Sequence, residues 1–74
     1  MKIFPNPTNN AIQITGNPSI NNKNFTITDI LGKTVKSGKI NNPDDKIDLS
    51  DFNSGAYYLK IEDYLNAFKI IKID

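Results

Sequence analysis

The sequence predicts a small all-β domain, either a sandwich or a barrel. Apolar and polar residues alternate with a period of two in several short runs, and turn-forming residues recur roughly every eight to twelve positions. No stretch keeps the i, i+3, i+4 spacing of an amphipathic helix over three turns. A chain of 74 residues has room for one domain, 1–74, and for a thin core.

The first half of the chain contains three expected strands. Residues 11–15 alternate, with Ile12 and Ile14 on one face. Residues 25–37 are expected to form a hairpin, because two alternating runs flank a turn in which Gly32 can take a positive φ.

The second half contains three more expected strands, at residues 46–49, 56–62 and 67–73. The last of these has apolar residues on both faces, which suggests that it is covered twice. Phe4 is expected to close one end of the core, and the Tyr57 hydroxyl to bond a backbone group at a corner. The expected core consists of Ile14, Ile27, Val35, Leu49, Tyr57, Leu59 and Ile61.

Composition excludes several classes of function. The net charge is +1, and all nine basic residues are scattered lysines, which does not suit a nucleic-acid partner. No apolar run approaches the roughly 20 residues of a membrane span. Pro5 and Pro7 interrupt any N-terminal signal peptide, so the chain is expected to be a fragment of a longer secreted parent.

The chain is not expected to be an enzyme and is expected to need no cofactor. It has no histidine and no cysteine, and therefore lacks the usual general base and the most reactive nucleophile. Gly32-Lys33-Thr34 has the form of a phosphate-loop end, but Ile27 stands where that loop needs glycine. The aspartates between Asp44 and Asp51 lack the central glycine of a calcium loop and are expected to bind calcium weakly at most. No metal site is predicted.

An ordered series of short motifs runs through the chain. The motifs are Ile3-Phe4-Pro5-Asn6-Pro7, Ile12-Gln13-Ile14, Ile27-Thr28-Asp29-Ile30-Leu31-Gly32-Lys33-Thr34-Val35, Ile47-Asp48-Leu49-Ser50, Phe52-Asn53-Ser54-Gly55-Ala56-Tyr57-Tyr58-Leu59 and Lys69-Ile70-Ile71-Lys72. In order and spacing the series resembles the type A C-terminal sorting domain of type IX secretion cargo in the Bacteroidetes. Thr28 and Phe52 depart from the family pattern, which often has an aromatic residue and leucine there.

The resemblance implies an immunoglobulin-like antiparallel β-sandwich of about six to seven short strands. It implies a secretion signal that directs covalently attached N-terminal cargo across the outer membrane, from the periplasm to the cell surface or the medium. The implied partners are the outer-membrane translocon, shuttle proteins and a sortase of the type IX machinery.

Recognition is expected to involve the last strand and the hairpin turn. The resemblance points to the last strand, and the residues suggest an exposed edge able to accept another strand, with Lys69 and Lys72 on its polar rim. The candidates are Gly32, Lys33, Lys69, Ile71, Lys72 and Ile73. The alternative functions are a carbohydrate-binding or adhesive module, with Tyr58 and Tyr64 as the exposed aromatic residues, and a passive spacer.

Overall fold

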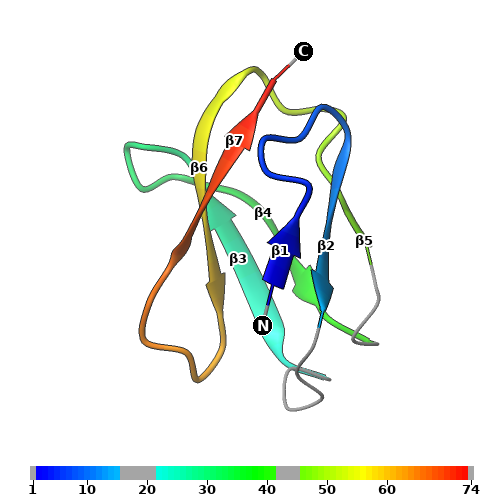
Figure 1. Cartoon of the computed structure of the whole chain (residues 1–74). Coiled ribbons are helices and arrows are strands. Elements are labelled where there is room, and N and C mark those ends of the chain that lie inside the picture. Colours follow the sequence, from blue (N-terminus) through cyan, green and yellow to red (C-terminus); the bar gives the residue numbers. More distant parts are fainter. Residues whose placement is uncertain (1, 16–21, 42–45, 74) are drawn as a thin grey trace.

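The computed structural model describes residues 2–15, 22–41 and 46–73, and within them the chain forms seven strands in two antiparallel sheets (Figure 1). The strands are β1 (Lys2–Phe4), β2 (Ala11–Thr15), β3 (Asn24–Thr28), β4 (Thr34–Lys39), β5 (Lys46–Asp48), β6 (Gly55–Ile61) and β7 (Phe68–Lys72). The strand order is β1-β2-β5 in one sheet and β4-β3-β6-β7 in the other. The described residues contain no helix, so the all-β sandwich prediction is confirmed.

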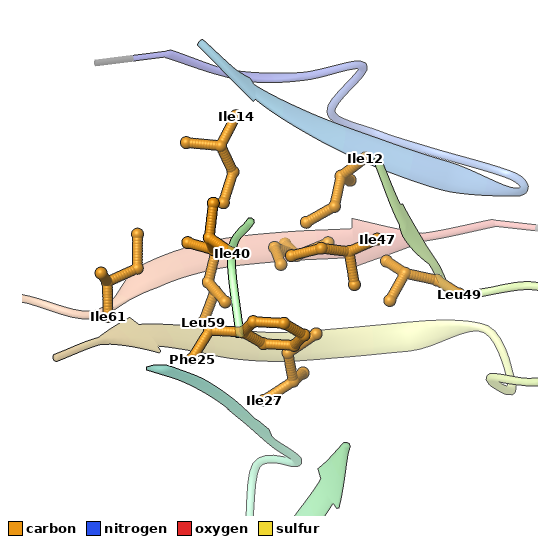
Figure 2. Packing of buried hydrophobic residues seen from close by; sticks show 10 residues of the cluster. Ile12, Ile14, Phe25, Ile27, Ile40, Ile47, Leu49, Leu59 and Ile61 are labelled. Atoms are coloured by element: carbon orange, nitrogen blue, oxygen red, sulfur yellow. The ribbon is translucent and has the colours of Figure 1, made fainter. Parts of the chain in front are cut away.

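The core lies between the two sheets, as the period-two alternation predicts. Figure 2 shows Ile12 and Ile14 of β2 pointing toward side chains of the facing sheet, among them Ile27 and Leu59. The buried apolar residues are Ile12, Ile14, Phe25, Ile27, Ile40, Ile47, Leu49, Leu59, Ile61 and Ile70. Five of the seven predicted core residues are in this set: Ile14, Ile27, Leu49, Leu59 and Ile61.

Tyr57 is only half-buried and packs against the margin of the core. Its hydroxyl donates a hydrogen bond of 2.7 Å to the carbonyl of Asn53, which confirms the predicted corner contact. Its ring lies 4.8 Å from the ring of Phe52, centroid to centroid. The Tyr57 side chain therefore holds the segment before β6 through an aromatic contact and a hydrogen bond.

The prediction that Val35 is buried is wrong, because β4 contains a bulge. Ile27 pairs with Lys36 and Thr28 pairs with Thr34, so Val35 is the extra residue of the bulge and is 39% exposed. The inner face of β4 is formed instead by Lys36 and Gly38. At Gly38 a Cβ would come within 3.0 Å of the Phe25 ring, so the ring packs directly over the backbone.

The N-terminus differs from the sequence prediction in two ways. Residues 2–4 form β1, which the sequence did not reveal and which pairs antiparallel with β2. Phe4 does not close the core, since it is 43% exposed. The run is too short to show alternation, and Pro5 ends it.

Candidate recognition surface

β7 divides its side chains between the two faces of its sheet. Phe68, Ile70 and Lys72 point inward, whereas Lys69 and Ile71 point outward. Lys72 is only 4% exposed, although the sequence places it on a polar rim. It pairs with Gly55 on the inner face of the sheet, and its Nζ donates to the carbonyl of Ile73 at 3.2 Å. Its side chain is therefore not part of the outer face.

The outer edge of β7 is covered by residues 6–8, which we call the clasp. The amide group of the Asn6 side chain bonds the backbone of β7 as a neighbouring strand would. Its Nδ2 donates to the Lys69 carbonyl, and its Oδ1 accepts from the Ile71 amide, both at 2.9 Å. Thr8 continues the pairing, donating to the Ile71 carbonyl at 2.9 Å and accepting from the Ile73 amide at 2.8 Å. The expectation of an exposed edge is therefore wrong from Lys69 to Ile73.

The position of the clasp is fixed by Thr8. The Thr8 side chain is buried, and its hydroxyl donates to the Ala11 carbonyl at 2.7 Å and accepts from the Asn10 amide at 3.2 Å. Thr8 also forms an isolated parallel bridge with Lys72. Figure 1 shows this connection between β1 and β2 lying beside β7. The clasp thus links the two sheets.

The turn between β3 and β4 is held by one aspartate. The Asp29 carboxylate accepts from the amides of Leu31 and Lys33, at 2.8 and 3.0 Å. Its backbone accepts from the Gly32 amide at 3.1 Å and donates to the Lys33 carbonyl at 2.9 Å. Gly32 has a φ of +85°, which confirms the predicted positive φ, a value that disfavours a side chain. Lys33 is exposed at the end of the turn.

Strand register brings this turn and β7 to the same end of the four-stranded sheet. Thr28 pairs with Tyr58, and Tyr58 pairs with Lys69, so these residues form one row on the outer face. Two strand spacings separate Thr28 from Lys69, about 10 Å. The turn begins one residue after Thr28. The structure therefore gathers Gly32, Lys33, Lys69 and Ile71 near one end of this sheet, and Ile73 follows β7 with an exposed side chain.

The other outer strand of this sheet, β4, has no strand partner on its far side among the described residues. A hydrogen bond joins it to the facing sheet, in which Lys36 Nζ donates to the Asp48 carbonyl at 2.8 Å. The pKa of Asp48 is lowered, first by the hydrogen bond from the Ser50 amide and in smaller part by the charge of Lys36. A lysine-to-carbonyl hydrogen bond therefore supplements the apolar core on this side of the sandwich.

The described residues do not bring together the side chains of a metal site. They contain no cluster of three carboxylate, histidine or cysteine side chains that could hold a metal ion, and Asp44 and Asp45 of the calcium expectation lie outside them. Two hollows of about 260 and 300 Å³ lie along the sandwich, and neither is lined by a carboxylate from the part of the chain that the structure describes. No helix in that part is long and apolar enough to cross a membrane.

The aromatic residues do not form the platform of a sugar site. Tyr58 is partly exposed on the outer face, but Tyr64 packs against the core and is half-buried. The expectation that both are exposed is wrong for Tyr64. The carbohydrate-binding alternative loses one of its two candidate residues.

The family model of the secretion system C-terminal sorting domain matches residues 2–73. The chain belongs to this family. The sorting domain is a C-terminal signal for type IX secretion, which implies interaction with the type IX machinery and export to the cell surface or the medium. The family is not an enzyme family. No curated protein sequence and no solved structure matches the chain.

Sequence reasoning did not single out four residues in and around β7 and the β3–β4 turn, namely Asn6, Thr8, Ile30 and Leu31. Asn6 and Thr8 lie in a Pro-rich turn signal, and their partners in β7 are more than 60 residues away, so no local pattern reveals the clasp. Ile30 and Leu31 lie within the predicted turn. Two apolar residues in a turn that is expected to be solvent-exposed are unusual, and this pattern could have marked them from the sequence alone.

Proposed function

We propose that the sorting domain is recognised through side chains on the outer face of β7 and on the β3–β4 turn, and not through strand addition to β7. The observation that supports this most directly is the clasp, which occupies the backbone groups of the β7 edge from the Lys69 carbonyl to the Ile73 amide. A receptor strand could pair there only after displacing four hydrogen bonds.

The proposed contact surface consists of Gly32, Lys33, Lys69, Ile71 and Ile73. Lys33 and Lys69 supply positive charge, and Ile71 and Ile73 supply apolar surface. Gly32 contributes through the turn geometry that sets the direction of Lys33. Lys72 is left out of the contact surface because it is buried, and in this proposal it supports the end of the sandwich.

The proposal also covers the route of export. The domain is the type A signal of a Bacteroidetes cargo, attached at the C-terminus of a longer protein. It is read in the periplasm, passes the outer-membrane translocon with its cargo, and has a sortase among its partners. The resemblance of the ordered motifs supports these steps.

An export assay tests the proposal. The full chain is fused to the C-terminus of a periplasmic reporter in a host with a type IX system, and the reporter is measured in the periplasm, on the surface and in the medium. The wild-type fusion should leave the periplasm. Lys69→Glu should reduce export, because it reverses a charge on the proposed surface, whereas Lys46→Glu, an exposed lysine of the other sheet, should not.

Both substitutions should keep the fold, since exposed charges usually change stability by less than about 0.5 kcal/mol. Retention of the wild-type fusion in the periplasm would count against the sorting function itself. Equal export of the Lys69→Glu and Lys46→Glu fusions would remove Lys69 from the contact surface. Export that persists after deletion of residues 67–74 would show that the signal lies elsewhere.

A further inference from the structure

The tip of the β3–β4 turn presents two neighbouring aliphatic side chains to solvent. Ile30 is 70% exposed and Leu31 is 88% exposed, and neither belongs to the core or packs against it. Turn positions of this kind usually carry polar residues or glycine. The core of the sandwich therefore does not account for two adjacent aliphatic residues at this position.

The backbone that carries these side chains is already ordered. Asp29 makes four hydrogen bonds within the turn, two through its carboxylate and two through its backbone. Figure 1 shows the turn projecting from the sheet beside β6. A protruding apolar tip on a fixed turn loses little conformational entropy when it enters a pocket, which favours binding.

The charge at the tip defines the partner further. The Asp29 carboxylate is engaged by two backbone amides, and Lys33 forms no ion pair with any of the described residues. The tip therefore presents two aliphatic side chains followed by one unbalanced positive charge. A complementary site would be an apolar pocket with a carboxylate on its rim.

We propose that Ile30 and Leu31 insert into such a pocket on the type IX protein that reads the domain, with Lys33 paired to the rim carboxylate. This inference rests on the proposed function and names the chemistry of its partner. A second copy of the chain does not fit, because Lys46 lines both of its hollows and Lys39 lines one of them. These lysines would repel Lys33, and no carboxylate of the described residues lines either hollow.

The chain supplies a matched control for the tip. Leu65 is 95% exposed and lies in the connection between β6 and β7, in the same sheet as the tip. Leu31→Asn and Leu65→Asn therefore make the same chemical change at equally exposed turn positions. Urea denaturation should give both variants the same unfolding midpoint as the wild type. A functional difference between them would then not come from folding.

The reporter fusion carrying the full chain measures the effect. Leu31→Asn should lower export by about tenfold or more, as expected for loss of a central apolar anchor, while Leu65→Asn should be exported like the wild type. Leu31→Met should retain export, because it keeps the apolar character. Lys33→Arg should be tolerated and Lys33→Glu should not, because only the former keeps the charge.

The outcomes separate this inference from the proposed function. A wild-type fusion that stays in the periplasm overturns both. A wild-type fusion that is exported, together with a Leu31→Asn fusion exported equally well, overturns only the role of the tip. A purified wild-type chain that sediments as a dimer, while Leu31→Asn sediments as a monomer, would assign the tip to self-association and overturn the pocket on the type IX protein.

Discussion

β7 and β4 are the two outer strands of the same sheet, and they are protected in opposite ways. β7 has buried side chains on its inner face, and its edge is covered by the clasp. β4 has mostly exposed side chains, no strand partner on its far side among the described residues, and a bulge at Val35. One edge is sealed by pairing, and the other is left open.

The open edge carries features that discourage pairing with another chain. Bulges and lysines blunt an edge strand, and β4 has Val35 in a bulge together with Lys36 and Lys39. Lys36 is also occupied by its bond to the Asp48 carbonyl. β7, which carries Lys69 and Ile71 of the proposed contact surface, is the better protected of the two strands, so its outward side chains can be read without exposing its backbone.

The largest difference between the two edges is expected from apolar truncation. Ile70 of β7 is fully buried, so Ile70→Ala should lower the free energy of unfolding by about 2–5 kcal/mol, through lost burial and a cavity. Val35→Ala on β4 should cost less than about 1 kcal/mol, because the bulge exposes that side chain. Urea denaturation of both variants measures the difference. Similar losses for the two variants would contradict the assigned faces.

The clasp itself is tested by Asn6→Ala. This change removes the two side-chain hydrogen bonds to Lys69 and Ile71, and we expect a loss of about 1–2 kcal/mol in the free energy of unfolding. Asn9→Ala is the matched control, since Asn9 lies in the same connection and is exposed. Amide hydrogen exchange at Ile71 gives a local measurement and should accelerate only in Asn6→Ala. An unchanged exchange rate there would show that Asn6 does not protect the edge.

The smallest expected effect is a difference in acid sensitivity. The folded protein holds the pKa of Asp48 below the ordinary value of 3.8, so its contribution to stability is present above that value and is lost as the pH falls through the lower folded pKa. Asp48→Asn should remove this part of the pH dependence. Unfolding measured at pH 6 and pH 3 should therefore show a smaller difference for the variant. The clasp bonds involve only amide, carbonyl and hydroxyl groups, which do not titrate in this range, so acid should weaken the part of the sandwich around Asp48 of β5 first. An unchanged pH dependence of stability in Asp48→Asn would show that Asp48 does not contribute to it.

Sequence reasoning predicted the features that depend on local periodicity. The inward residues of β2, β3 and β6, the positive φ of Gly32 and the corner contact of Tyr57 all follow from neighbouring residues. β1 was missed because three residues ending at proline show no alternation. The burial of Val35 was predicted wrongly because a bulge shifts the pairing register of β3 and β4 by one residue, and no residue type in the sequence indicates the bulge.

The proposed surface was less predictable than the fold. Its candidates on β7 and in the turn could be named, but their grouping depends on the register that aligns Thr28, Tyr58 and Lys69 across three strands. The burial of Lys72 depends on the register that places it inward, opposite Gly55 of another strand. The clasp depends on contacts across almost the whole chain. Such long-range pairings are set by packing and not by the local sequence.

The clasp has a mechanical consequence. Thr8 bridges Lys72 in the parallel direction, so the chain enters the clasp at one end of β7 and leaves β7 at the other. A force pulling residues 2 and 73 apart would load the four clasp bonds along the strand axis, in shear, so that they must fail together and not one after another. A domain dragged through a pore by one end and held at the other would thus resist unravelling at the contact that shields its last strand.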